Sequence, residues 1–439
     1  MSLARRATLA LLGGLLASFG QSGWLPGSLC AVPLLLVAVV GATPRQALLL
    51  GALHGAADAL DLAGAAGFGG IALVMIFGGA AAGRAVVIGA FAVVDTRLPE
   101  RARPLAFAVI FVVVDTAVAA LQGPLHTPLS LGSSQVDLPL LAQPAALGGE
   151  RGVTFLVVLV GALVGEAARA RRRGPLVAAV VIVGVWLGVG VALRAALPLP
   201  PAAIRAAAIQ GAVPGFVHEL ARYDEDAARA IEHVYVDATR RAAARGARLV
   251  IWPEGSIRAG GAAHDALRER LRALSRELGA TLIVGADVPQ PGGGRWNGAL
   301  VIAPDGRVDV VGKVGLLPVL EPEYVPAPKL RVVDVVGARV GILICAESLT
   351  AAPAAVVAAA GAQAIVVIAN DAGLGRSRMS YIHSARARLR AIEHRVAVVH
   401  AGQWGTTLVA DAAGDVVARH DDPGFAVVDF VLPLAAAPR

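Results

Sequence analysis

The sequence contains little lysine, cysteine or charge for a chain of 439 residues. Lys313 and Lys329 are its two lysines, against many arginines, and charged residues make up 16% of the chain. A dense basic run with interleaved aromatic residues is absent, so we expect no nucleic-acid partner. The two cysteines, Cys30 and Cys345, are too few for a disulfide framework. The scarcity of lysine makes the position of each remaining one informative.

Apolar residues, in contrast, are abundant. They make up 56% of the chain, and the mean hydropathy is +0.68, which is too apolar for an ordinary soluble protein. The excess lies in the N-terminal half, where apolar runs predict about seven membrane spans, although several runs are shorter than a full span requires. The runs are Ala7–Gly20, Leu29–Gly41, Ala47–Leu62, Phe68–Val94, Leu105–Leu121, Val153–Ala167 and Pro175–Leu197.

Arginines cluster in alternate loops of this region, and the loops between them carry almost none. Cytoplasmic loops collect Arg and Lys, so the pattern predicts a cytoplasmic N-terminus and, with an odd number of spans, export of everything after Leu197. Three charged residues, Asp58, Asp61 and Arg84, lie inside predicted spans, where charge is costly. Either they lie at span ends or face the bundle interior, or they serve a function.

The sequence texture changes from Ala203 onward. Short β-rich runs alternate with helical stretches that contain Arg and Glu, such as the predicted helix Val217–Arg245. A hairpin is expected around Pro304-Asp305-Gly306 because these residues suit a tight turn. This pattern predicts an α/β layered fold in which helices cover two sheets. We therefore expect two domains, a transmembrane helical bundle at 1–198 and a catalytic domain at 199–439.

Three residues with catalytic potential follow short apolar runs. Glu254 follows Leu249–Trp252, Lys313 follows Val308–Gly312, and Cys345 ends Val340–Cys345. Each has an ordinary explanation when taken alone. Glu254 could be a carboxylate at a helix N-terminus, Lys313 a surface lysine, and Cys345 a core cysteine. Lysine is otherwise so rare here that its place at a strand end favours a functional reading. An ammonium is compact and can change its proton affinity, which a guanidinium cannot do usefully.

Together the three residues fit acyl-transfer chemistry. Glu254 would take the thiol proton, and Cys345 would attack an ester or amide carbonyl and hold the acyl group as a thioester. Lys313 and the backbone N–H of Ala346 would stabilise the oxyanion. No metal-ligand motif or phosphate-binding glycine loop is present, so we expect no metal and no cofactor. Three carboxylates are candidates for orienting Lys313: Glu321, Glu323 and Glu347.

Further motifs follow in order along the chain. They are Ser130-Leu-Gly-Ser-Ser-Gln-Val-Asp137, Gly152-Val-Thr-Phe-Leu156, Ile209-Gln-Gly211, Trp252-Pro-Glu254, Trp296-Asn-Gly298, Pro304-Asp-Gly306, Glu323-Tyr-Val-Pro326, Ile344-Cys-Ala-Glu347, Asn370-Asp371, His383, Arg388, Arg390 and Glu393. In this order they resemble the carbon–nitrogen hydrolase (nitrilase) superfamily, and within it the apolipoprotein N-acyltransferase family. The resemblance covers about residues 5–420.

This resemblance implies a helical transmembrane bundle that carries an αββα nitrilase-like domain on the outer, periplasmic face of the bacterial inner membrane. It implies that Cys345 takes a fatty acyl chain from a membrane phospholipid as a thioester. The acceptor would be the N-terminal amine of diacylglyceryl-cysteine on a lipoprotein. The resemblance also implies a monomer. Glu254, Lys313 and Cys345 would form the catalytic triad.

The chain departs from the family pattern at four places. The family normally ends with a final membrane span, whereas this chain ends at Arg439 after a single predicted strand. Ala346 replaces the usual Tyr, and Gly373 replaces a Trp. Two extra residues precede Glu323, so Glu321 competes for the role of second glutamate. Two rival functions stay open: a membrane-tethered amidase in which water resolves the thioester, and a binding domain without catalysis.

Overall fold

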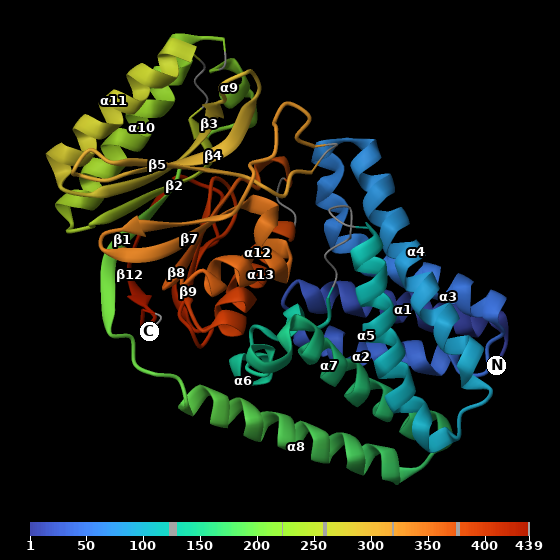
Figure 1. Cartoon of the computed structure of the whole chain (residues 1–439). Helices are drawn as coiled ribbons and strands as arrows, with labels where there is room; N and C mark the ends of the chain where they lie inside the picture. Colours follow the sequence, from blue (N-terminus) through green and yellow to red (C-terminus); the bar gives the residue numbers. More distant parts are fainter. Residues whose placement is uncertain (123–129, 222, 258–260, 318–319, 375–377, 438–439) are drawn as a thin grey trace. The chain divides into compact units, whose positions relative to one another are not determined.

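A computed structural model describes residues 1–122, 130–221, 223–257, 261–317, 320–374 and 378–437 (Figure 1). The chain divides into two compact units. One is helical and comprises Met1–Ala196 together with a short segment that ends at Ala385. The other runs from Leu197 and contains the rest of the chain.

The helical unit is built mainly from long apolar helices, and each of the seven predicted runs overlaps one of them. Five helical stretches among the described residues are long and apolar enough to cross a membrane: Pro44–Gly67, Gly70–Asp95, Glu100–Gln122, Ala145–Ala170 and Arg173–Ala195. A total of seven spans remains a prediction. The helices are α1 (Leu3–Gln21), α2 (Leu25–Val39), α3 (Pro44–Asp58), α4 (Gly70–Asp95), α5 (Arg103–Gln122), α6 (Pro139–Ala142), α7 (Ala145–Ala170) and α8 (Arg173–Ala195).

Small residues allow the first helices of this unit to approach closely. A Cβ added at Gly14 of α1 would lie 2.3 Å from the carbonyl oxygen of His54 in α3. A Cβ at Gly55 would lie 2.2 Å from the carbonyl oxygen of Ala80 in α4. Both distances are impossible for real side chains, so glycine is required at these crossings. Close backbone packing of this kind is how apolar helices associate where the hydrophobic effect offers little drive.

Two of the three charged residues predicted inside spans, Asp58 and Arg84, face one another in the interior of the helical unit, whereas Asp61 is only half-buried. Arg84 Nη2 lies 3.4 Å from Asp58 Oδ2, and Arg84 Nη1 lies 3.8 Å from Asp115 Oδ1. Gln21 donates a hydrogen bond of 3.0 Å to Asp58, and the Arg84 guanidinium lies 4.4 Å from the centre of the Phe111 ring. The cost of burying Arg84 is thus offset by two carboxylates and an aromatic face.

The second unit contains two six-stranded sheets. The first has the strand order β12-β1-β2-β3-β4-β5 and the second β11-β10-β9-β8-β7-β6. The strands are β1 (Ala202–Gln210), β2 (Leu249–Ile257), β3 (Thr281–Pro289), β4 (Arg295–Ile302), β5 (Val308–Gly312), β6 (Arg331–Val335), β7 (Ala338–Ile344), β8 (Ala364–Ala369), β9 (Ala397–Gly402), β10 (Thr407–Ala410), β11 (Val416–His420) and β12 (Ala426–Leu434).

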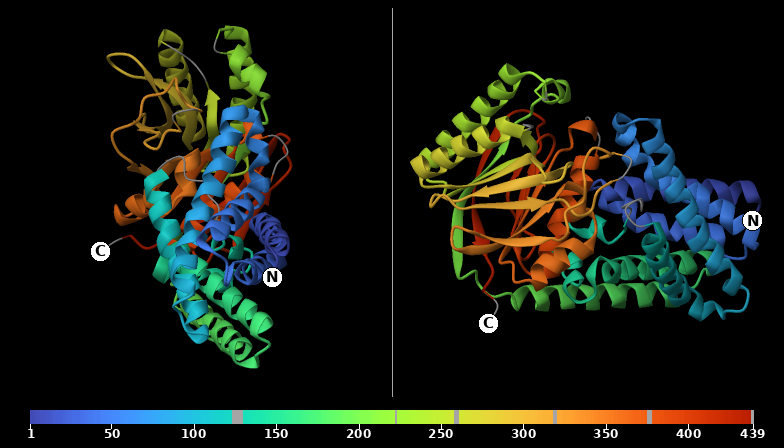
Figure 2. Two further views of the ribbon diagram at one scale, coloured as in Figure 1. Left: turned by 90° about the vertical axis from the view of Figure 1, so that its right-hand side faces the viewer. Right: turned by 45° about the horizontal axis from the view of Figure 1, so that its top comes forward.

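The layers of this unit follow from the alternation of side chains along each strand. In β1, Ala206 and Ala208 pack between the two sheets, whereas Ala207 and Ile209 pack on the outer face under α10 and α11. Helix α12 and the later turns of α13 cover the outer face of the other sheet. Figure 2 shows α10 and α11 (yellow-green) outside their sheet. The predicted αββα fold is confirmed.

The helices of this unit are α9 (Gly215–Leu220), α10 (Glu225–Ala244), α11 (Gly261–Leu278), α12 (Ala351–Ala359) and α13 (Met379–His394). The prediction of one helix over Val217–Arg245 is wrong, because the structure has two. Asp224 separates them, and its carboxylate accepts hydrogen bonds from the N–H groups of Asp226 and Ala227. An aspartate N-cap starts a new helix because it satisfies donors of the first turn.

Candidate active site

The three catalytic candidates come from strands of both sheets. Lys313 directly follows β5, and Cys345 directly follows β7. Glu254 lies inside β2, which continues to Ile257, so the prediction that a strand ends before it is corrected. The pairing of β2 with β3 shifts register between Trp252 and Ile257, and this irregularity re-aims the side chains around Glu254.

Lys313 is held between two carboxylates. Its Nζ lies 2.8 Å from Glu321 Oε1 and 3.6 Å from Glu254 Oε1, and its side chain is only 1% exposed. Burial alone would lower the pKa of Lys313, but a Cys345 thiolate, once it forms, and the carboxylates of Glu254 and Glu321 act in the opposite direction, and the net shift of the pKa is upward. The amine is therefore a fixed ammonium in a dry site, where a charge acts strongly on a developing oxyanion.

Of the two glutamates that compete for the position beside Lys313, Glu321 makes the contact. Its Oε1 accepts the hydrogen bond from Lys313 Nζ, and its Oε2 accepts one of 2.9 Å from the backbone N–H of Leu317. Glu323 is exposed. The sequence alone left this choice open because both residues lie in the same loop.

Asn297 of β4 also enters the site, although the sequence marked it only as part of a motif. Its Nδ2 lies 2.6 Å from Glu254 Oε1 and 2.9 Å from Glu321 Oε1. Its backbone carbonyl accepts a 2.8 Å hydrogen bond from the N–H of Lys313. The strand period could have found it, since Ala299 and Val301 of the same strand pack between the sheets.

Cys345 occupies a strained position at the start of a short 3-10 turn, Cys345–Leu349. Its φ is +53°, in the left-handed region that residues other than glycine rarely adopt. The residue as a whole is half-buried. Burial, and then the charge of Glu254, raise the pKa of Cys345 well above its ordinary value. The sulfur is therefore a thiol at neutral pH and needs a base during attack.

Two neighbours of Cys345 were predicted to assist. Ala346 is the second residue of the same turn and is half-buried, and the role of its N–H in binding an oxyanion remains a proposal. Glu347 is buried and joins the two sheets. Its Oε1 accepts hydrogen bonds from Val314 N (2.7 Å) and Gly315 N (3.1 Å), and its Oε2 accepts one from Ile344 N (2.8 Å). Burial raises the pKa of Glu347 despite these donors.

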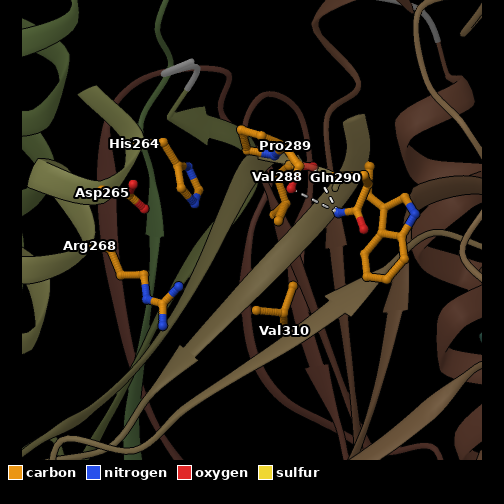
Figure 3. A pocket seen from close by; sticks show the side chains of 8 residues that line it. His264, Asp265, Arg268, Val288, Pro289, Gln290 and Val310 are labelled. Atoms are coloured by element: carbon orange, nitrogen blue, oxygen red, sulfur yellow. Dashed lines mark hydrogen bonds between the residues drawn. The ribbon is translucent and has the colours of Figure 1, made fainter. Parts of the chain in front are cut away.

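A separate cavity of about 370 Å³ lies against the outer face of the first sheet (Figure 3). Its lining includes His264 and Arg268 of α11, Gln290, and Trp296 of β4. Burial lowers the pKa of His264, so this imidazole is neutral near pH 7. Trp296 precedes Asn297 in β4, and successive side chains of a strand point to opposite faces. The cavity is thus on the other side of the sheet from the Glu254–Lys313 cluster.

Two family models match the chain. One, described as carbon-nitrogen hydrolase, matches residues 205–429. The other, described as the apolipoprotein N-acyltransferase N-terminal domain, matches residues 13–163. The two matches fall on the two units of the structure, and the first includes all of Glu254, Lys313 and Cys345.

Similar curated proteins carry the name apolipoprotein N-acyltransferase. One from Geobacter metallireducens is 30% identical over 65% of this chain and 60% of its own length. One from Methylococcus capsulatus is 29% identical over 66% of this chain and 60% of its own length. The chain thus spans about three fifths of the length of these relatives.

Similar solved structures cover about half of this chain. An amidase from Nesterenkonia sp. AN1 is 23% identical, with a TM-score of 0.43, over 53% of this chain and 93% of its own. Nit3 of Saccharomyces cerevisiae, a nitrilase-superfamily member, is 18% identical, with a TM-score of 0.44, over 54% of this chain and 92% of its own.

Proposed function

Because the chain belongs to the carbon–nitrogen hydrolase family and its N-terminal part matches the N-terminal domain of apolipoprotein N-acyltransferases, we propose that it is a membrane-bound N-acyltransferase. The donor is a membrane phospholipid, and the acceptor is the N-terminal amine of diacylglyceryl-cysteine on a lipoprotein. The observation that carries the proposal is the buried ammonium of Lys313, held between Glu254 and Glu321 within electrostatic reach of Cys345.

In the first half-reaction, Cys345 Sγ attacks the ester carbonyl of the phospholipid while Glu254 takes the thiol proton. The carbonyl oxygen becomes an oxyanion, which Lys313 and the N–H of Ala346 stabilise. As the intermediate collapses, the ester C–O bond breaks, and Glu254 returns the proton to the departing glycerol oxygen. The products are a Cys345 thioester and a lysophospholipid.

In the second half-reaction, the acceptor amine attacks the thioester carbonyl, so a C–N bond forms and the C–S bond breaks. Glu254 takes a proton from the amine and passes it to the departing sulfur. The same oxyanion site serves both steps because both pass through a tetrahedral intermediate at one carbon. The thiol of Cys345 is regenerated, and the lipoprotein leaves with an amide-linked acyl chain.

The location follows from the helical unit. Residues 1–198 would hold the enzyme in the inner membrane, and residues 199–439 would work on the periplasmic face. The apolar helices and the arginine-bearing alternate loops support this orientation. A phospholipid substrate explains why a nitrilase-like unit is joined to membrane helices at all.

A membrane-tethered amidase is the second candidate, because the carbon-nitrogen hydrolase match covers the catalytic unit irrespective of the acceptor. In that case an amide C–N bond is cleaved and water resolves the thioester. The chemistry of Glu254, Lys313 and Cys345 is unchanged. The two functions differ in whether an amine or water reaches the acyl-enzyme.

The intact mass of the purified protein in phospholipid nanodiscs tests the proposal. We expect a fatty-acyl mass increment that hydroxylamine removes and that the Cys345→Ala variant lacks. Addition of a diacylated lipopeptide should discharge the thioester and yield a triacylated peptide. Discharge at the same rate without lipopeptide would select the amidase. Failure to form any adduct with phospholipid would overturn the acyltransferase proposal.

A further inference from the structure

We infer that Asn297 is a positioning residue for the acyl transfer: its amide nitrogen holds Glu254 and Glu321 together and leaves one defined oxygen of Glu254 to carry the proton. The inference rests on the proposed function for the identity of the acyl step, and on the geometry alone for the arrangement of the base. Asn297 is 6% exposed, so water cannot substitute for these contacts.

The two hydrogen bonds use the full donor capacity of one amide. Asn297 Nδ2 carries two hydrogens, and its two partners are the Oε1 atoms of Glu254 and Glu321, at 2.6 Å and 2.9 Å. Both partners are carboxylate oxygens, which accept only. The reverse amide orientation would place an oxygen against two anions, so the chemistry of the site fixes which end is nitrogen.

The contacts on Glu254 divide its two oxygens between two tasks. Asn297 donates to Oε1, and Lys313 Nζ is also closest to Oε1, at 3.6 Å. An oxygen that already receives these donors is a poor proton acceptor. Oε2 is therefore the atom that takes the thiol proton from Cys345. Asn297 thus selects the reacting oxygen of the base without touching the substrate.

The same amide also manages the repulsion between two close carboxylates. Glu254 and Glu321 both lie within hydrogen-bond reach of one nitrogen, and like charges at such separations favour uptake of a proton by one of them. Lys313 supplies one positive charge for two negative ones. The two N–H groups of Asn297 add the remaining stabilisation of the ionised pair. A base that took up the proton at rest could not accept one from the thiol.

The backbone of Asn297 also helps to position Lys313. Its carbonyl accepts the hydrogen bond of Lys313 N–H at 2.8 Å, which extends the pairing of β4 with β5 by one step. One residue therefore sets both the backbone position of the lysine and the position of its two carboxylate partners.

The test compares Asn297→Asp and Asn297→Leu with wild type in the full-length protein, purified in detergent that is free of phospholipid. Asp keeps the size and removes both donors, and Leu removes all polarity. The readout is the pH dependence of Cys345 alkylation by iodoacetamide, followed by peptide mass after digestion, which separates Cys345 from the exposed Cys30. This reaction needs no lipid, so it reports on the base even if the acyltransferase proposal fails. Acylation by phospholipid is measured in parallel.

The acid limb is the part of the profile in which the alkylation rate falls as the pH is lowered. Both variants are expected to move this limb to higher pH, further for Asp than for Leu. They are also expected to slow alkylation at neutral pH about 100-fold. The matched control is Thr239→Val, which removes a buried hydroxyl bonded to Trp252 on the outer face of the same sheet. It should lower the melting temperature and leave the limb in place. The inference would be overturned if both variants lost the same factor in alkylation rate at every pH, with the acid limb in its wild-type place. It would also be overturned if neither variant lost any rate.

Discussion

Each unit of this protein buries a cation between two carboxylates, and the two arrangements differ in an instructive way. In the helical unit Arg84 lies between Asp58 and Asp115 and against the Phe111 ring. In the nitrilase-like unit Lys313 lies between Glu254 and Glu321. A planar guanidinium suits a fixed tie between helices, whereas a compact ammonium leaves room for a reacting oxygen beside it. The choice of cation therefore distinguishes the cluster that we expect to be structural from the cluster that we propose to be catalytic.

The largest expected effect comes from exchanging the cation in the catalytic cluster. Lys313→Arg keeps the charge but places a larger, planar guanidinium between the two carboxylates. That group leaves no room for an oxyanion beside it. We expect the single-turnover rate of Cys345 acylation to fall about 1,000-fold. Lys329→Arg, at the exposed second lysine, is the matched control and should leave the rate unchanged. Acylation by Lys313→Arg at the normal rate would remove the distinction between the two clusters.

The next effect is on stability, in the helical unit. Arg84→Met leaves the buried Asp58 without its cation, so we expect a loss of about 3 kcal/mol, seen as a lower melting temperature in detergent. Arg97→Met, at an exposed arginine close to the end of α4, should have little effect. Acylation per folded molecule should stay normal in both. If Arg84→Met folded stably but lost acylation, Arg84 would belong with Lys313 in function.

The smallest of the three effects concerns the base. In Glu254→Gln the thiol has no proton acceptor, and alkylation at neutral pH should fall about 100-fold. Because burial and, after it, the Glu254 charge raise the pKa of Cys345, the wild-type thiol is protonated at neutral pH. Burial persists in the variant, so its rate should climb with pH through the alkaline range as thiolate forms. Intact-mass alkylation across that range checks this, and a flat profile would contradict it.

Several features were predictable because they depend on short stretches of sequence. The apolar runs before Lys313 and Cys345 identified strands whose ends deliver these residues, and the change of texture near Ala203 separated the two units. The alternation of short β-rich runs with helical stretches predicted helices that cover two sheets, and the family resemblance implied the αββα layers. These are local patterns, and local physics decides them.

Other features depend on tertiary approach and could not be predicted. Glu321 and Glu323 are two residues apart in one loop, and only the folded loop brings the first to Lys313. The strand period places Asn297 on the inner face of β4, but its contact with Glu254 of β2, a strand that is distant in sequence, arises only in the folded protein. The separation of α9 from α10 was missed because the capping capacity of Asp224 was outweighed by a continuous helical composition.

The carboxylate of Glu347 has a consequence for the design of altered enzymes. It accepts hydrogen bonds from the N–H groups of Val314 and Gly315, which follow Lys313, and from that of Ile344, which precedes Cys345. A single side chain therefore links the backbone beside Lys313 to the backbone beside Cys345. The two sheets can therefore drift in sequence without losing their alignment as long as this clip is kept. In the proposed mechanism, a change at Glu347 is therefore expected to alter the spacing between Cys345 and Lys313 while both residues are kept.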